Sequence, residues 1–190
     1  MQSAKDSFYV TLCARLAALN PQRTVFLDGA TRPAVVVVEN EYITALGPLP
    51  EAFYLGWGTA QPVAAMRNGQ PPMMAMDCTI SYWTGGSAQN QGVDRGRVLA
   101  QLDSELLAIC SPPFTDQCDY TQSPAADLGT NILWTLPELR MKTQNQIQGT
   151  APAWTVMGDQ LVSSPSNSVP VIRLERAASL TIFFYPEAAS

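Results

Sequence analysis

From residue 74 to residue 82 the chain alternates strictly between two kinds of side chain, in the sequence MAMDCTISY. Methionine, cysteine, isoleucine and tyrosine occupy every second position, with alanine, aspartate, threonine and serine between them. Because successive side chains of a β-strand point to opposite faces of its sheet, this pattern predicts a strand with one apolar face. Such a face has to be buried, so the chain needs neighbouring strands and an apolar layer to cover it.

Two segments have the spacing of amphipathic helices. In residues 3–19 apolar side chains recur at intervals of four, four and three, Ser3 is a candidate N-cap, and an Asn-Pro pair ends the pattern. A second helix is predicted over residues 93–110, with Asp94 as a candidate cap. The expected buried positions are Phe8, Leu12, Leu16 and Leu19 in the first helix and Val98, Leu99, Leu102, Leu106 and Ile109 in the second.

Other short apolar runs predict further strands. Residues 24–27 and 34–41 are expected to form a hairpin across an Asp-Gly turn, and the four valines of the second segment favour a strand buried on both faces. Proline, glycine and amide residues interrupt most of the remaining chain, which predicts long Pro-rich loops at residues 44–72 and 114–169. The additional short strands are expected at residues 53–57, 131–136, 171–174 and 178–185.

Together these elements predict an α+β fold, with a small mixed or antiparallel sheet of about four to six strands and two helices packed on one face. A chain of 190 residues can bury a sizeable core, so we expect a single domain over residues 1–190. An irregular stretch as long as residues 114–169 is uncommon in a compact domain unless it binds something or folds around a partner.

Charged residues make up only 14% of the chain, and the net charge is −5. No run of three Lys or Arg residues occurs, so we expect no sequence-specific binding of nucleic acid. A surface with so few charges, in a chain with 15 prolines, favours a subunit whose faces are covered by neighbours. The N-terminal sequence MQSAKDSFYV lacks the pattern of a secretory signal and no window approaches about 18 apolar residues, so neither secretion nor a membrane span is expected.

The four cysteines lie far apart in the sequence, and the first three fall in apolar periodic segments. Cysteine in such segments behaves as a small hydrophobic residue, so we expect reduced core residues. Cys110 and Cys118 are the one pair close enough to suggest a bridge, and the expected reducing compartment argues against it.

The chain contains no histidine, so it lacks the Ser-His-Asp and Cys-His nucleophilic sites and the commonest neutral metal ligand. Its cysteine spacings do not fit a thiolate zinc site, and neither of the glycine-rich motifs that cradle phosphates is present. We therefore expect a protein that is not an enzyme and that uses no cofactor or metal.

Glu39 and Glu41 offer an alternative of another class. On a strand their carboxylates would point to the same side, an arrangement that a carboxylate-based enzyme or a cation-binding module could use. Solvated charges at a strand end are the simpler interpretation. Asp103 and Glu105, two residues apart on the second helix, would diverge by about 200° and cannot form such a pair.

Two arginines and two tryptophans are the candidate subunit-interface residues. Arg95 and Arg97 belong to the densest charge cluster of the chain, and guanidinium groups bind carboxylates bidentately at interfaces. A solvated helix end is the alternative explanation for this cluster. Trp57 and Trp134 lie in or beside predicted loops, where an aromatic side chain is either a contact anchor or part of the core.

The N-terminal helix up to Leu19 is followed by FLDGATRPAVVVVENE from Phe26, MAMDCTISYW from Met74, DRGRVLAQLDSELLAI from Asp94 and ASLTIFFYPE from Ala178. In order and local character this succession resembles the tail-terminator proteins of long-tailed phages. The likeness covers roughly half of the chain and rests on element order, not on an invariant signature. The long Pro-rich loops depart from the family pattern.

The resemblance implies a small α+β subunit that forms a hexameric ring at the head-proximal end of the tail tube, stops tube polymerisation and joins the tail to the neck. The implied partners are further copies of the chain, the tail-tube protein and a neck or connector protein. The implied location is the virion, after synthesis in the cytoplasm of a bacterial host. Prophages and tail-derived particles use similar subunits, and another tail-tube or head-tail connector subunit is the alternative within this class.

Overall fold

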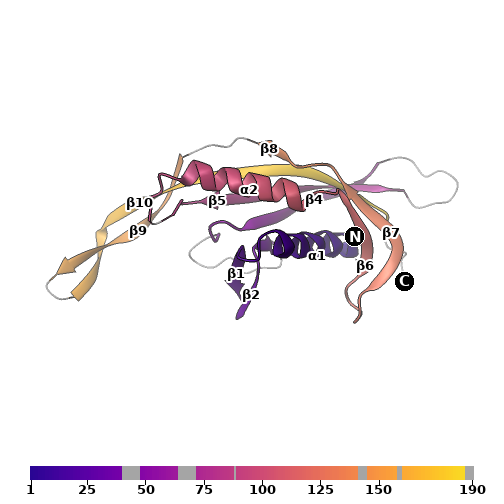
Figure 1. Cartoon of the computed structure of the whole chain (residues 1–190), viewed down its shortest axis with the longest axis horizontal. Helices are drawn as coiled ribbons and strands as arrows, with labels where there is room; N and C mark the ends of the chain where they lie inside the picture. Colours follow the sequence, from indigo (N-terminus) through magenta and orange to yellow (C-terminus); the bar gives the residue numbers. More distant parts are fainter. Residues whose placement is uncertain (40–47, 64–71, 88, 141–144, 158–159, 187–190) are drawn as a thin grey trace.

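The computed structural model describes residues 1–39, 48–63, 72–87, 89–140, 145–157 and 160–186. Within these residues the chain forms two helices, a curled, multi-stranded sheet and a separate two-stranded sheet (Figure 1). The mixed α and β content predicted from the sequence is therefore confirmed.

The first helix, α1 (Gln2–Leu19), follows the predicted spacing along most of its length. Phe8, Leu12 and Leu16 are fully buried, whereas Leu19 is 51% exposed because the helix ends there and its last turn leaves the core. The predicted N-cap is wrong: Ser3 lies inside the helix, and the residue at the N-cap position is Met1, whose side chain makes no capping hydrogen bond.

The second helix, α2 (Arg95–Ile109), buries Leu99, Leu102, Leu106 and Ile109, as predicted, whereas Val98, also predicted to be buried, is only half-buried. Its C-terminal end is held by α1, because the guanidinium of Arg15 donates hydrogen bonds to the carbonyl oxygens of Ile109 (3.0 Å) and Pro112 (2.7 Å). A cation at a helix C-terminus satisfies carbonyl groups that have no partner within the helix. This contact fixes the two helices relative to each other.

The Asp-Gly turn forms as predicted, but the hairpin around it differs from the prediction. Strand β1 (Thr24–Leu27) pairs with β2 (Ala30–Pro33), and Asp28 and Gly29 take the positive φ angles, 51° and 78°, that such a two-residue turn requires. The valine run forms a separate strand, β3 (Val35–Val37), which pairs in parallel with β4 (Phe53–Pro62). The three valines of β3 are buried, as is usual for a strand in a parallel pair, whereas the fourth valine of the run, Val38, lies beyond the strand and is 40% exposed.

The main sheet is built around the predicted alternating strand, β5 (Met74–Thr84), which is confirmed. It pairs antiparallel with the end of β10 (Gln160–Phe184), from Leu174 opposite Thr84 to Phe184 opposite Met74. On both strands one apolar row is mostly buried, with Met74 half-buried, and the alternate row, which includes Phe183 on β10, is more exposed. The strand order is β3–β4–β5–β10–β7–β6, with β7 spanning Ala126–Trp134 and β6 spanning Phe114–Asp119.

The predicted loop at residues 114–169 is wrong. This region holds β6, β7, β8 (Glu138–Arg140), β9 (Asn145–Met157) and the first part of β10, which continues to the end of the sheet as one strand. Backbone pairing between neighbouring strands stabilises these segments, and the preference of a residue for a strand depends strongly on that context. In the other predicted loop, residues 44–72, β4 reaches Pro62, while residues 44–47 and 64–71 lie outside the described part of the chain.

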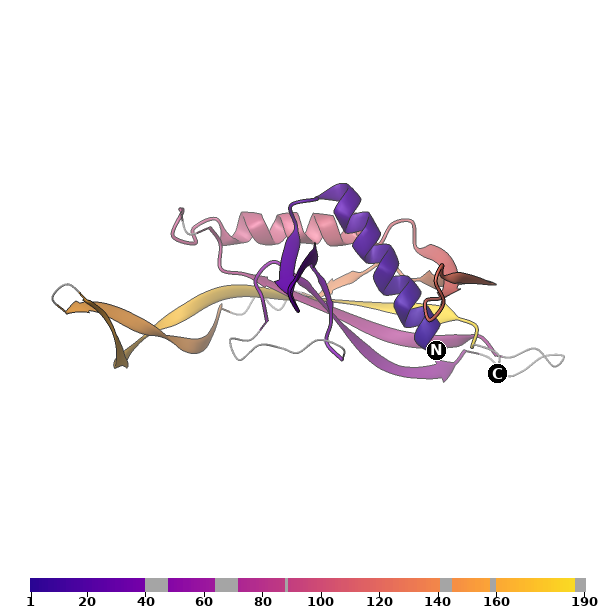
Figure 2. The ribbon, with the colours of Figure 1, turned by 90° about the horizontal axis from the view of Figure 1, so that it is seen from below.

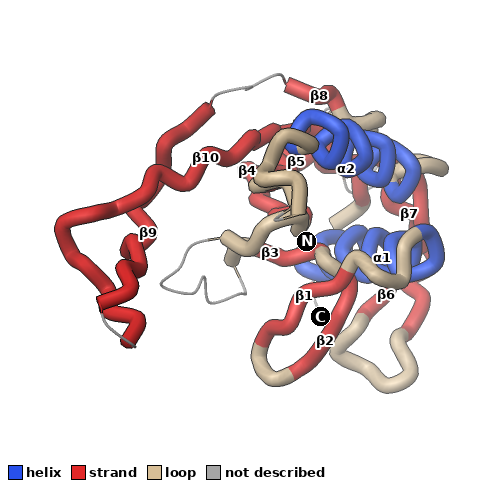
Figure 3. Tube along the Cα trace, turned by 60° about the vertical axis from the view of Figure 1, so that its left-hand side comes forward, coloured by secondary structure: helices blue, strands red, loops and turns tan. Residues whose placement is uncertain are grey.

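One end of β10 leaves the sheet. Before Leu174 it pairs antiparallel with β9 alone, from Gln160 opposite Met157 to Leu174 opposite Asn145. Figures 1 and 3 show this two-stranded ribbon as an arm that projects from the body, on the side away from β6 and β7. We refer to residues 145–157 and 160–174 as the β9–β10 ribbon.

Candidate subunit interface

The two candidate tryptophans are held by α1. The ring of Phe8 lies between them, with its centroid 6.0 Å from the ring of Trp57 and 5.1 Å from that of Trp134, both in edge-to-face geometry. Trp134 is buried, and its indole nitrogen donates to the carbonyl oxygen of Cys110 at 2.9 Å. Trp57 is half-buried beneath the ammonium group of Lys5. The structure therefore places Trp134 in the core and Trp57 at its margin.

Arg95 and Arg97 point to different environments. Arg95 is half-buried, and its Nε donates to the carbonyl oxygen of Gly85 at 3.0 Å. Its guanidinium lies so close to Gly92 that a Cβ atom there would come within 2.3 Å of Nη2. Arg97 is exposed. Arg95 therefore holds the loop before α2 in place, and Arg97 is the member of the pair that is open to a partner.

Asp94 stabilises the same loop instead of capping the helix. It stands at the N-cap position of α2 but makes no side-chain capping bond. Its carboxylate accepts hydrogen bonds from the backbone N–H of Ser87 (2.9 Å) and from the side-chain amide of Asn90 (3.1 Å). The hydrogen bonds from Asn90 and Ser87 lower the pKa of Asp94 to about 2.

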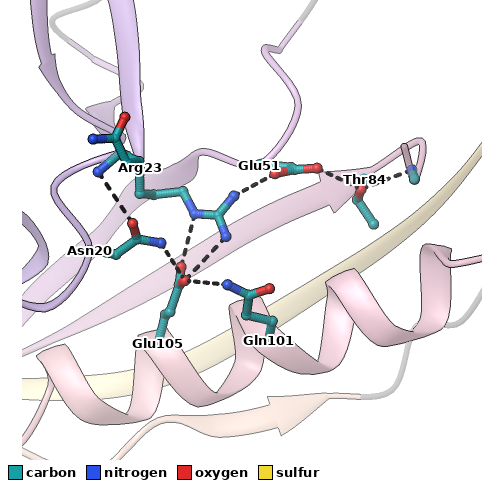
Figure 4. A network of polar contacts seen from close by, with 8 residues as sticks. Asn20, Arg23, Glu51, Thr84, Gln101 and Glu105 are labelled. Atoms are coloured by element: carbon teal, nitrogen blue, oxygen red, sulfur yellow. Dashed lines mark hydrogen bonds and ion pairs between the residues drawn. The ribbon is translucent and has the colours of Figure 1, made fainter. Parts of the chain in front are cut away.

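The two acidic residues of α2 diverge, as the helical spacing requires, and each joins a separate polar network. Figure 4 shows the first, in which Glu105 accepts hydrogen bonds from Asn20, Arg23 and Gln101. Arg23 also pairs with Glu51, which in turn accepts a hydrogen bond from the Thr84 hydroxyl. This network joins the end of α1, the start of β4, the end of β5 and the middle of α2.

Asp103 belongs to the second network. Its carboxylate accepts a hydrogen bond from the hydroxyl of Tyr82 at 2.6 Å and pairs with Arg176 on β10. Burial, together with the hydrogen bond to the Asp103 carboxylate, raises the pKa of the Tyr82 hydroxyl. Both networks fix α2 against the sheet, and their partners are satisfied within the chain, so we assign them a structural role.

The structure describes one of the two candidate carboxylates and all four thiols. Glu39 pairs with Lys5 at 2.9 Å, and Glu41 lies outside the described residues, so the geometry gives the carboxylate-pair hypothesis no support at Glu39. Burial raises the pKa of the Cys78 thiol, and raises that of Cys110 to about 12. No disulfide joins the four cysteines, all of which are described. Within the described residues no cluster of His, Cys, Asp or Glu is placed to hold a metal ion.

An apolar row that the sequence did not reveal crosses the edge of the sheet. Phe114 on β6 lies opposite Leu133 on β7, which lies opposite Phe183 on β10. Phe114 and Leu133 are 48% and 50% exposed, and Phe183 is half-buried. The neighbours of Leu133, Ile132 and Trp134, are buried on the other face. We call Phe114, Leu133 and Phe183 the apolar ladder.

A signal for the ladder was present in the sequence. In a half-buried strand the outward positions are usually polar, and the run Ile-Leu-Trp at residues 132–134 places leucine at an outward position. The partners of that leucine could not be found, because the sequence of β6 was assigned to a loop.

A shallow groove of about 490 Å³ lies beside the ladder. Asp77, Thr135 and Thr181 contribute to its lining, and Thr181 immediately precedes Ile182, the neighbour of Phe183. The hydroxyl of Thr181 donates to Asp77 at 2.9 Å, and its backbone N–H donates to the hydroxyl of Thr135 at 3.0 Å. Glu138 and Arg140, which carry opposite charges, also line the groove, so its lining mixes polar and charged side chains.

No protein-family model matches the sequence, and no curated protein matches it. Neither described helix is long and apolar enough to cross a membrane.

Proposed function

We propose that the chain is a structural subunit of a phage tail or tail-like particle that resembles tail terminators. In this proposal copies of the chain form a ring, with six as the expected number, at the head-proximal end of the tail tube. The ring stops tube polymerisation and joins the tail to the neck. The partners are other copies of the chain, the tail-tube protein and a neck or connector protein.

The observation that carries the proposal is a surface suited to contacts with protein. The apolar ladder exposes Phe114 and Leu133 side by side, and the β9–β10 ribbon extends beyond the sheet. Contiguous apolar groups at the surface of a folded chain are typical of protein interfaces. Such a surface supports a role in assembly, and the order of the segments that resemble tail terminators supports the particular assembly.

We also propose how the two helices pack on the sheet. We place both helices on one face of the sheet, as drawn in Figure 2, where α1 and α2 lie on the same side of the long strands. Phe8 supports this, because it reaches Trp57 on β4 and Trp134 on β7, while α2 contacts β5 and β10. The opposite face, which carries the apolar ladder, is then available to partners.

The test is the state of the purified protein in solution and beside tail tubes. Light scattering should give the mass of a closed oligomer, and negative-stain images should show rings that cap one end of a tube of tail-tube protein. A repeated layer along the tube, or a position within the neck, would instead assign the chain to the alternative tube or connector class. Monomers alone, with and without the tube protein, would contradict the proposal.

A further inference from the structure

The β9–β10 ribbon is a two-stranded extension of the main sheet. Each of its strands pairs with the other, and among the described residues β9 pairs with no further strand. An isolated two-stranded hairpin is marginally stable at best in water, because it buries little apolar surface for the entropy it loses. A ribbon of 13 residues on β9 therefore needs cover from another surface.

The composition of the ribbon favours cover by protein. Between residues 145 and 174 the charged residues are Asp159 and Arg173, and valine, isoleucine and leucine recur on both strands. Exposed strand edges in monomeric proteins are usually protected by charged side chains, above all lysine, because an open edge pairs readily with another chain. Charged side chains are few along the ribbon, so its sequence is suited to a face that is covered after assembly, while Pro152, Pro170 and two register shifts limit backbone pairing along its edges.

The apolar ladder is a matching surface at the other end of the molecule. In Figures 1 and 2 the ribbon projects from one end of the body, while β6 and β7, which carry Phe114 and Leu133, lie at the opposite end. Neither Phe114, Leu133 nor Phe183 is charged, and the groove beside them provides a hollow on the same part of the sheet. An arm with few charges can lie on an uncharged ladder with little cost of removing ions from water.

The dimensions agree with such a contact. At about 3.3 Å per residue, a strand of 13 residues reaches up to roughly 43 Å. A body of about 150 residues has a radius of gyration of roughly 15 Å, so the arm is long enough to lie across a neighbouring copy. Because arm and ladder are different surfaces on opposite ends, their contact is head-to-tail, and head-to-tail contacts close into rings when the rotation allows.

We infer that the β9–β10 ribbon of one copy of this chain lies on the apolar ladder of the next copy, at Phe114, Leu133 and Phe183. The inference rests on the proposed function in that it names the contact by which the ring closes. The contact itself requires self-association of the chain and no other component of a tail.

The direct test is cross-linking from a photo-reactive amino acid placed at Leu133 in the full-length protein. The cross-linked product should be intermolecular, and mass spectrometry should map the second site to peptides within residues 145–174. A probe at Leu128, an exposed leucine on the same strand but outside the ladder, is the matched control and should give few cross-links to those peptides. Oligomers whose Leu133 cross-links lie elsewhere would overturn the inference.

A second variant measures the energy of the contact. Leu133→Glu should weaken self-association at least about tenfold by analytical ultracentrifugation, because the contact would bury a carboxylate. Leu128→Glu, made as the control, should change it little. Equal circular dichroism spectra and melting temperatures would show that both variants remain folded, and equal association of the two variants would refute the inference.

The outcomes separate the inference from the function that we propose. Rings that cap tubes, with Leu133 cross-linked to a site other than the ribbon, would leave the proposed function standing and remove this contact. Ribbon-to-ladder cross-links in an oligomer that does not bind tubes would support the contact and remove the tail role. A protein that stays monomeric under all conditions would remove both.

Discussion

The guanidinium of Arg23 and the carboxylate of Glu105 form an ion pair that joins the segment after α1 to the middle of α2. Their Nε and Oε2 atoms are 2.9 Å apart, and the two side chains are only 10% and 8% exposed. Burial alone would lower the pKa of Arg23, but its hydrogen bonds with Glu105 and the charges of Glu105 and Glu51 outweigh this and raise the pKa. The guanidinium therefore supplies the cation that offsets burial of the Glu105 carboxylate.

Replacing Arg23 by leucine should destabilise the chain strongly, because the Glu105 carboxylate would stay buried without its cation. The expected loss is on the order of 3 kcal/mol in the free energy of unfolding, measured by urea denaturation. The double variant Arg23→Leu/Glu105→Leu should recover much of that loss, since no uncompensated charge remains. A double variant as unstable as the sum of the two single variants would show that the groups act independently.

The same carboxylate should make stability depend on pH in the acid range. Burial would raise the pKa of Glu105, but the hydrogen bonds from Arg23 and Asn20 reverse this effect, and the pKa lies below the ordinary value of 4.5. The unfolded chain then binds more protons than the folded chain as the pH falls through this window, so the stabilisation is present above pH 4.5 and is lost below it.

The variant Glu105→Gln measures this effect. The difference in free energy of unfolding between the natural chain and the variant should narrow as the pH is lowered from neutrality to below 4.5. Glu138→Gln, which removes an exposed carboxylate on β8, serves as a control for general effects of acid. A difference that stays constant across this range would refute the role of the Glu105 charge.

The elements that were correctly predicted have one buried face and one exposed face. The apolar residues of β5 therefore alternate, and Leu99, Leu102 and Leu106 recur at helical spacing, because one side of each element contacts the core. Residues 114–130 show no such alternation or helical spacing of apolar side chains. In β6 only Gln117 is buried, and the strand is stabilised by backbone pairing with β7, which depends on residues distant in sequence.

The candidate interface was predicted less well than the fold, for a related reason. A tryptophan beside a predicted loop gives the same sequence pattern whether it contacts a partner or packs in the core. In the structure Trp134 is buried against Phe8, so it belongs to the core. Likewise Arg95 and Arg97 were equivalent in the sequence. Their environments differ because Gly92, in the loop before α2, has no side chain and leaves space for the Arg95 guanidinium.

The core face of α2 can be tested by two leucines on the same helix. Leu102 is fully buried, whereas Leu107 is 39% exposed. Leu102→Asp should cost several kcal/mol, about 3–5, and give largely insoluble protein, because it buries a charge without a partner. Leu107→Asp should remain soluble, with a melting temperature within a few degrees of the natural chain. Equal behaviour of the two variants would show that the face is assigned wrongly.

The two arginines at the start of α2 should differ when their charge is reversed. Arg95→Glu should destabilise the folded chain and increase hydrogen exchange in residues 85–87 and 89–94, because the loop loses the hydrogen bond to the carbonyl oxygen of Gly85 and gains a carboxylate near Asp94.

Arg97→Glu should leave the melting temperature unchanged, since Arg97 is exposed. If Arg97 contacts a neighbouring copy, the same variant will weaken self-association in sedimentation measurements at low salt, and the effect will diminish as salt screens the charge. Unaltered sedimentation of Arg97→Glu would assign this residue to the solvated surface, and unaltered hydrogen exchange in Arg95→Glu would remove the role of Arg95 in the loop.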